Sequence, residues 1–201
     1  MEEYDTLKFY NDNAQKYYNQ TVNGNMQEVY NGFLYLLPQK GHILDFGCGS
    51  GRDSKYFLDH GYDVTAVDGS EKLCKLAEAY IKHKVLCMKF NELSDVSLYD
   101  GIWACSSILH VERKNLPDIL RKMIIALKNN GIMYTSFKKG DCELVESGKY
   151  YNYINREIME RMLYDIDLDT EIVGYTENVT CSGVNRPTAT WSNYLIKKRT
   201  R

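Results

Sequence analysis

The sequence predicts an α/β fold with a doubly wound, mostly parallel seven-stranded sheet whose last strand runs antiparallel. Three observations support this prediction. Short apolar stretches alternate with amphipathic helical stretches between residues 25 and 137. A glycine cluster follows the first apolar stretch. After Gly140, two strand-like stretches joined by a loop can complete the sheet as an antiparallel pair.

The elements follow from local signals along the chain. Apolar residues recur at helical spacing after Asn25, and Pro38 ends this first helix. Later helices are expected over residues 53–60, 70–81, 117–129 and 155–165. The seven expected strands cover residues 42–46, 62–67, 84–88, 100–105, 132–137, 171–175 and 189–197.

The composition excludes several classes of protein. With 201 residues, 44% hydrophobic and 26% charged, the chain has the composition of an ordinary one-domain globular protein. A net charge of −2 lacks the basic excess of a dedicated nucleic-acid binder. No apolar run could cross a bilayer and the acidic start is unlike a signal peptide, so we expect a cytoplasmic protein without membrane contact. Six cysteines without a C-x-x-C pair should be reduced thiols, and no metal site is expected.

Gly47, Gly49 and Gly51 lie between the first strand and the next helix. Such a turn brings backbone amides and a helix N-terminus close to a ligand. Phosphates fit poorly, because no Lys-Ser or Lys-Thr follows the glycines and Arg52 stands where a dinucleotide fingerprint has its third glycine. Asp45, at the end of the strand, would repel a pyrophosphate but could pair with an ammonium group. A zwitterionic amino-acid group is the better match.

Asp68 ends the second expected strand, 17 residues after Gly51. An acidic residue at this place can accept hydrogen bonds from both hydroxyls of a ribose. Nicotinamide-dependent enzymes share this feature, so Asp68 alone indicates a nucleoside without choosing the cofactor. Asp68 could instead cap the next helix, although Ser70 is the more natural cap.

The stretch Asp-Phe-Gly-Cys-Gly-Ser-Gly at residues 45–51 resembles the signature of class I S-adenosylmethionine-dependent methyltransferases. Residues 99–111 resemble the family's fourth-strand segment. Residues 9–17 with Thr21 resemble the N-terminal segment that folds over the cofactor in many small bacterial members. The resemblance covers about residues 9–137. It implies a Rossmann-like fold, S-adenosylmethionine as cofactor and S-adenosylhomocysteine as product.

The resemblance also implies roles for matching residues. Asp45 and the glycine backbone would hold the methionine moiety, and Asp68 the ribose. Phe90 would lie at the adenine, where many members have an acid in place of Asn91. Cys105 would lie under the methyl group, although it could equally be a core residue. The cofactor-binding residues implied in this way are Tyr17, Thr21, Asp45, Gly47, Cys48, Gly49, Gly51, Arg52, Asp68, Gly69, Ser70, Phe90, Asn91 and Cys105.

No obligatory catalytic motif is expected, because methyl transfer needs alignment and, for some acceptors, removal of a proton. The Asn-Pro-Pro-Tyr sequence used on nucleobases and glutamine is absent, since residues 104–107 read Ala-Cys-Ser-Ser. His110 is the candidate base, because it follows the fourth strand and histidine titrates near neutrality. A structural role in a Leu-His-Val turn explains this histidine at least as well.

A compact cover over the sheet edge favours a small-molecule substrate. Without a large insertion, only the N-terminal helices and residues 138–153 can form this cover, in which Tyr150, Tyr151 and Tyr153 could make an aromatic wall. Arg186 could meet an anionic substrate or form a surface salt bridge. The expected single domain has an N-terminal helical cap (1–40), a cofactor-binding core (41–137) and a substrate-side segment with the final strands (138–201).

Two other functions are compatible with the same pattern. An NAD(P)-dependent oxidoreductase on a dinucleotide fold shares the strand, the glycine turn and the ribose acid. A non-catalytic cofactor-binding module could keep the fold and the ligand without the reaction.

Overall fold

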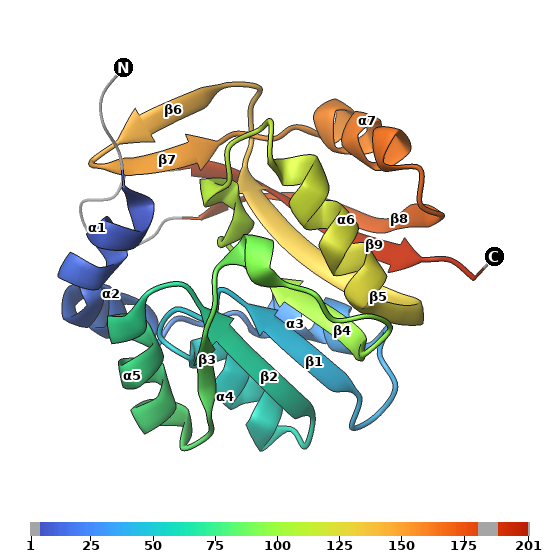
Figure 1. The fold of residues 1–201 in the computed structure, drawn as a ribbon. Coiled ribbons are helices and arrows are strands. Elements are labelled where there is room, and N and C mark those ends of the chain that lie inside the picture. Colours follow the sequence, from blue (N-terminus) through green and yellow to red (C-terminus); the bar gives the residue numbers. More distant parts are fainter. Residues whose placement is uncertain (1–4, 181–188, 201) are drawn as a thin grey trace.

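The computed structural model describes residues 5–180 and 189–200 (Figure 1). Its main sheet has the strand order β3-β2-β1-β4-β5-β9-β8. The first five strands pair in parallel, whereas β9 is antiparallel to both β5 and β8. The predicted fold class is therefore confirmed. The strands are β1 (His42–Phe46), β2 (Asp63–Asp68), β3 (Val85–Cys87), β4 (Tyr99–Ala104), β5 (Leu127–Lys138), β8 (Thr170–Thr180) and β9 (Ala189–Lys198).

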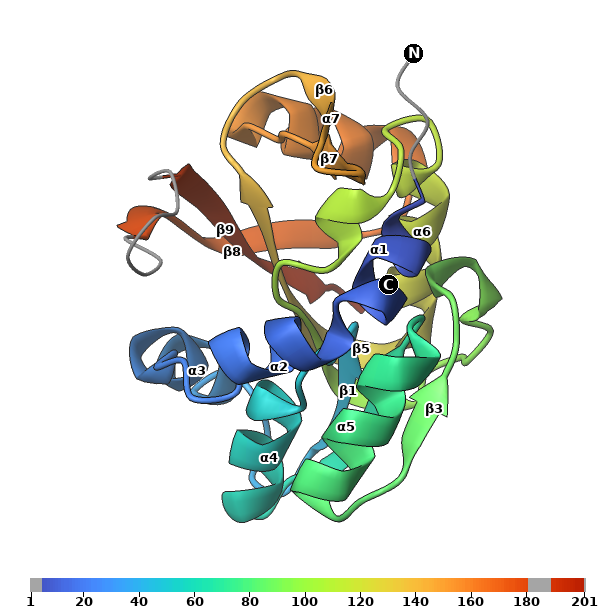
Figure 2. The same ribbon diagram turned by 90° about the vertical axis from the view of Figure 1, so that its left-hand side faces the viewer.

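Helices cover both faces of the sheet and form two buried clusters. α3 (Gln27–Leu34), α4 (Arg52–Asp59) and α5 (Glu71–Ile81) pack on one face, and α6 (Leu116–Ala126) and α7 (Arg156–Ile166) on the other. α1 (Thr6–Asp12) and α2 (Ala14–Thr21) lie against α5 (Figure 2). Within the described ranges, no helix has both the length and the apolar character to cross a bilayer.

β1 is the central strand that positions the site. Ile43 belongs to the cluster under α3, α4 and α5, and Leu44 belongs to the opposite one. Both faces of β1 are thus buried, as a continuous apolar run predicts for a parallel strand. β1 lies between β2 and β4, where the strand order changes direction. Ligands of open α/β sheets bind at the carboxyl ends of the strands at such a point, and the glycine cluster follows β1 there.

The boundary between α6 and β5 differs from the expectation. α6 ends at Ala126, and Leu127 is already extended and pairs with Tyr99. Asn130, with φ of +63°, lies inside β5 rather than at the end of a helix. A register shift in the β4–β5 pairing absorbs this irregularity. The Asn-Gly pair therefore marks a distortion within the strand.

A hairpin that the sequence reading did not predict lies between β5 and α7. Its strands β6 (Glu143–Glu146) and β7 (Lys149–Asn152) pair antiparallel. The two-residue loop, Ser147 and Gly148, has positive φ at both positions, which matches the twist of a hairpin. The hairpin brings residues of β7 toward the carboxyl end of β5.

Candidate functional site

The glycine loop after β1 has a left-handed backbone at all three glycines. The φ angles are +90° at Gly47, +57° at Gly49 and +79° at Gly51, which residues with a side chain rarely adopt. The N–H groups of Gly47 and Cys48 donate to the Val67 carbonyl of β2 at 2.9 and 2.8 Å. The loop is thereby tied to the neighbouring strand.

Neighbouring protein atoms also require glycine at these positions. A Cβ at position 47 would lie 2.5 Å from the Cβ of Ser107, in the segment after β4. A Cβ at position 51 would lie 2.9 Å from Ile81 of α5. Close packing of the loop against two other elements thus accounts for Gly47 and Gly51, in addition to their φ angles.

Asp68 ends β2 beside this loop, and its carboxylate is buried. It accepts hydrogen bonds from the backbone N–H of Gly49 at 2.9 Å and of Ser70 at 2.8 Å. Burial raises the pKa of Asp68, and these two hydrogen bonds partly offset the increase. Ser70 caps α5 by accepting from the N–H of Leu73, as predicted. Asp68 is therefore held at the loop by two backbone donors.

Asp45 lies beneath the loop with 1% of its surface exposed. The Ser54 hydroxyl, in the first turn of α4, donates to its Oδ2 at 2.5 Å. Burial raises the pKa of Asp45 to about 8, the Asp53 carboxylate adds to the increase, and the hydrogen bond from Ser54 opposes it. The protein interior around Asp45 thus favours the protonated form of this carboxyl group.

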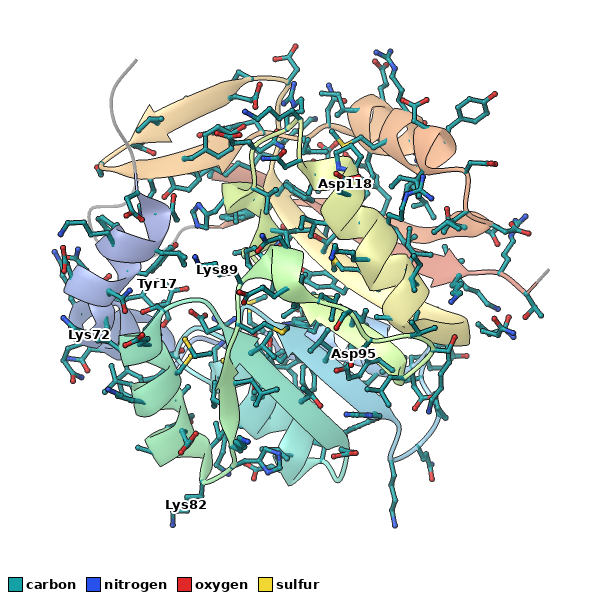
Figure 3. The ribbon with its side chains drawn as sticks, viewed as in Figure 1. Tyr17, Lys72, Lys82, Lys89, Asp95 and Asp118 are labelled. Atoms are coloured by element: carbon teal, nitrogen blue, oxygen red, sulfur yellow. The ribbon has the colours of Figure 1, made fainter. Side chains whose placement is uncertain are left out.

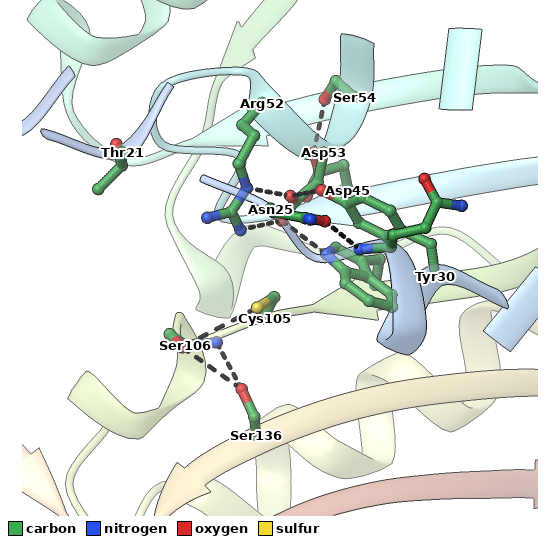
Figure 4. Close-up of polar contacts among 12 residues, drawn as sticks. Thr21, Asn25, Tyr30, Asp45, Arg52, Asp53, Ser54, Cys105, Ser106 and Ser136 are labelled. Carbon is green, nitrogen blue, oxygen red and sulfur yellow. Dashed lines mark hydrogen bonds and ion pairs between the residues drawn. The ribbon is translucent and has the colours of Figure 1, made fainter. Parts of the chain in front are cut away.

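A buried network centred on Asp53 lies next to it (Figure 4). Arg52 donates to the Asp53 carboxylate from Nε at 2.5 Å and from Nη2 at 2.9 Å. The Trp103 indole N–H donates at 2.8 Å, and the Tyr30 hydroxyl also donates. Burial opposes ionisation of Asp53, but Arg52 and these donors outweigh it and hold the pKa below its usual range. The network joins α3, α4 and β4.

A cleft of about 1200 Å³ opens beside the network, between the N-terminal helices and the carboxyl ends of β4 and β5. The predicted site residues that line it are Tyr17, Thr21, Arg52, Cys105 and His110. The other predicted cofactor-binding residues are not part of its lining, and for two of them a residue of the N-terminal helices lies in between. Tyr17 packs over Gly49, where a Cβ would be 3.2 Å from the ring, and Leu7 packs over Gly69.

Phe90 and Asn91 lie in the 3₁₀ turn η1 (Phe90–Glu92). The Phe90 ring packs against Phe46, with the ring centroids 4.8 Å apart, and also reaches the space above Gly47. The Asn91 side chain is exposed, and the backbone carbonyl of Asn91 accepts from the Lys122 Nζ at 2.8 Å. Phe90 thus joins the glycine loop, while Asn91 points its side chain to solvent.

The floor of the cleft is the segment after β4. Ser106 has φ of +52°, and its N–H donates to the Ser136 hydroxyl of β5 at 2.8 Å (Figure 4). Such a conformation in a residue other than glycine costs energy and is common at functional sites. Burial and then the Asp53 charge raise the pKa of Cys105 to about 11, so its thiol is neutral.

His110 ends the turn η2 (Ile108–His110) on the cleft wall. Its Nδ1 lies 2.7 Å from the Tyr150 carbonyl, which can only accept, so Nδ1 carries the proton. Nε2 therefore accepts from the Tyr10 hydroxyl at 2.8 Å. Burial lowers the pKa of His110 to about 4, and Lys149 and Lys138 contribute to the decrease. The imidazole is neutral at pH 7.

Two of the three tyrosines of the predicted aromatic wall lie in the cleft. Tyr151 and Tyr153 line the cleft. The Tyr150 hydroxyl instead donates to Glu143 within the hairpin. Arg186 lies outside the described residues.

Two features of the site were missed by sequence reasoning. The Ser107 hydroxyl is buried without a hydrogen-bond partner and lies 3.2 Å from the Cβ position of Gly47. Asp53 lies two residues after the last glycine of the motif, but its partners Tyr30 and Trp103 are distant in sequence. The local signal for Asp53 is its position as an acidic residue in the first turn of a helix, where it interacts favourably with the helix dipole.

A glycine turn at the switch point of a doubly wound sheet, with a buried carboxylate ending the neighbouring strand, defines a Rossmann-like α/β protein. The methyltransferase domain family matches residues 43–131. A methyltransferase of Staphylococcus carnosus is 26% identical over 178 residues, 81% of each chain. The ubiquinone biosynthesis O-methyltransferase of Rickettsia canadensis is 31% identical over 99 residues, 47% of this chain and 41% of that one. These matches support the assignment to the class I S-adenosylmethionine-dependent methyltransferases.

Solved structures agree on the fold. The 1,6-didemethyltoxoflavin-N1-methyltransferase of Burkholderia thailandensis superposes with a TM-score of 0.73 at 18% identity, over 96% of this chain and 85% of that one. This chain spans less than half the length of several curated relatives that it matches. The family assignment favours the methyltransferase prediction over the nicotinamide-dependent alternative.

Proposed function

We propose that this protein binds S-adenosylmethionine at the glycine loop and transfers its methyl group to a small molecule in the adjacent cleft. The observation that carries the proposal is the position of the loop and of Asp68 at the switch point of the sheet, next to a cleft of about 1200 Å³. The buried, unpartnered Ser107 hydroxyl beside Gly47 fits a polar ligand at the loop. The sulfonium group of the bound cofactor supplies an electrophilic methyl carbon.

The side chains at the loop and the cleft have different roles in this proposal. Asp68 accepts hydrogen bonds from the ribose, and Tyr17 and Thr21 of α2 cover the cofactor. The neutral His110 can accept a proton at Nε2, in exchange for the hydrogen bond from Tyr10. The domain would then consist of a cap (1–40), a cofactor-binding core (41–137) and a substrate-side segment (138–201).

Titration calorimetry with S-adenosylhomocysteine tests the cofactor assignment. We expect binding to the wild type, and Asp68→Ala should raise the dissociation constant about 10- to 100-fold, since hydrogen bonds to a charged group are lost. Asp63→Ala removes the exposed carboxylate at the other end of β2 and should bind like the wild type. Gly49 and Ser70 donate to different oxygens of Asp68, so the unfolding midpoint of Asp68→Ala is measured as well, to separate a lost ribose contact from a distorted loop. Tight binding of NADH in place of S-adenosylhomocysteine would contradict the proposal.

An assay that follows S-adenosylhomocysteine release tests the reaction. Small acids, amines, thiols and metalloid anions form the acceptor panel. Release with one acceptor that stops in Asp68→Ala supports methyl transfer. Cofactor binding without release on any acceptor would favour the non-catalytic module.

A further inference from the structure

Cationic and aromatic side chains converge on Tyr151 in the cleft wall. The Lys138 Nζ lies 3.9 Å from the centroid of the Tyr151 ring, and the Lys149 Nζ lies 5.3 Å from it. The His110 ring centroid is 5.0 Å from the same ring. Lys138 ends β5, Lys149 begins β7 and His110 ends η2, and all of them line the cleft. Three elements thus bring two ammonium groups to one aromatic ring.

The carboxylate of Glu146 compensates the charge of Lys138 weakly. Its Nζ lies 3.4 Å from Glu146, whose side chain is half exposed, whereas the Lys138 side chain is only 16% exposed. Because the contact is long and half of the Glu146 side chain is exposed, water screens this carboxylate. The second ammonium group, on Lys149, increases the positive potential at Tyr151. A desolvated positive site in a cleft attracts an anion more strongly than a lysine at the surface does.

We propose that the methyl acceptor is a small anion whose carboxylate or other oxyanion group binds between Lys138 and Lys149 at Tyr151. This inference rests on the proposed function and names the substrate class of the same cleft. Ammonium groups form short, charge-assisted hydrogen bonds with such oxygens. The rings of Tyr10 and Tyr153 line the same cleft and offer apolar surface to the rest of the acceptor.

The bound anion also affects the proton acceptor in the cleft. Lys149 and Lys138 lower the affinity of His110 for a proton. A negative group between the two lysines offsets their field, so His110 becomes more basic when the acceptor is bound. The cleft therefore couples recognition of the anion to removal of a proton.

The test uses the full chain saturated with S-adenosylhomocysteine, after calorimetry has established that this complex forms. The probes are two pairs that differ in charge but hardly in shape, benzoate with benzamide and salicylate with salicylamide. We expect the acid of at least one pair to bind at least 10-fold more tightly than its amide. Failure of S-adenosylhomocysteine itself to bind would count against the proposed function, not against the anion site alone.

Two variants and a matched control test where the anion binds. Lys138→Gln and Lys149→Gln should each reduce the preference for the acid at least fivefold, while S-adenosylhomocysteine binds as before. Lys82→Gln is the matched control, because Lys82 lies at the end of α5 far from Tyr17 and the cleft (Figure 3). Equal binding of acid and amide in both pairs, or no binding of either acid, overturns the inference. An acid preference that survives in Lys138→Gln and Lys149→Gln overturns it as well.

Discussion

Asp53 shows how one buried carboxylate can fix several elements. Arg52, Tyr30 and Trp103 all donate to it, and it is 6% exposed. A buried ion pair stabilises little by itself, but removal of one partner leaves an uncompensated charge. The contribution of Asp53 is therefore seen when it is lost.

We expect Asp53→Asn to lower the free energy of unfolding by about 3 kcal/mol, because the partly buried Arg52 stays charged without its counterion. Urea denaturation followed by circular dichroism measures the change. Asp59→Asn, which disrupts the exposed pair with Lys55, should leave the unfolding midpoint nearly unchanged. Equal midpoints for the two variants would show that Asp53 does not stabilise the fold.

His110 gives a second prediction for a single residue. The groups that face its ring are the Tyr10 hydroxyl, the Tyr150 carbonyl, Tyr151, Lys138 and Lys149. We expect its imidazole to titrate near pH 4, principally because it is buried. NMR spectra recorded from pH 3 to 8, with His110→Gln to assign the signal, give the midpoint. Lys138→Gln should raise this midpoint, and an ordinary midpoint near 6.5 in the wild type would contradict the buried neutral state.

At the scale of elements, α1 is attached to the start of α5, next to Asp68. The Asn11 Oδ1 accepts from the Ser70 hydroxyl at 2.9 Å and from the Lys72 N–H at 3.2 Å. Leu7 packs over Gly69 in the same region. Because α1 and α2 cover the predicted cofactor loop, their attachment should affect cofactor binding.

Asn11→Ala should weaken binding of S-adenosylhomocysteine about fivefold, corresponding to about 1 kcal/mol for the lost hydrogen bonds. Calorimetry measures the affinity, and hydrogen exchange should be faster over residues 6–21. Gln15→Ala, which removes a hydrogen bond within α2, is the control. If Asn11→Ala exchanged as slowly as this control and bound as tightly, the attachment of α1 would be unimportant.

The sequence predicted the elements whose signals are local. Alternating apolar segments indicated the parallel sheet, and Ser70 was recognised as the cap of α5. The end of α6 was placed too late, because an Asn-Gly pair can distort a strand as well as end a helix. Ser147 and Gly148 are typical of a two-residue hairpin turn, but no hairpin is predicted there from the sequence.

The missed part of the site depends on distant contacts. Tyr30 and Trp103 meet Asp53 only after α3 and β4 pack against α4, and no local pattern encodes that meeting. Lys138 and Lys149 converge on Tyr151 because the hairpin folds back onto the end of β5. Tertiary packing, rather than local sequence, creates the polar chemistry of the cleft.

At the scale of the whole molecule, Asp45 and His110 give the stability of the protein two opposite dependences on pH. His110 has a folded-state pKa below its unfolded value, so its contribution falls as the pH decreases from about 6.5 to about 4. Asp45 has a folded-state pKa raised from 3.8 to about 8, so its contribution is complete below pH 3.8 and is lost as the pH rises through 8. The two slopes oppose each other between pH 4 and 6.5, and only the Asp45 slope continues above that window.

We therefore expect Asp45→Asn to lose less unfolding free energy than the wild type between pH 6.5 and 9, because the amide has no proton to release. Urea denaturation at pH 6.5, 8 and 9 measures the difference, with Asp63→Asn at the exposed start of β2 as the control.

The same proton links the fold to the ligand. An ammonium group bound near Asp45 favours its ionised form, so S-adenosylhomocysteine should bind more tightly as the pH rises toward 8 and should release a proton on binding. Calorimetry in buffers of different ionisation enthalpy counts that proton, which should disappear in Asp45→Asn. Proton release that is unchanged in this variant would mean that the buried carboxyl under the glycine loop does not respond to the ligand above it.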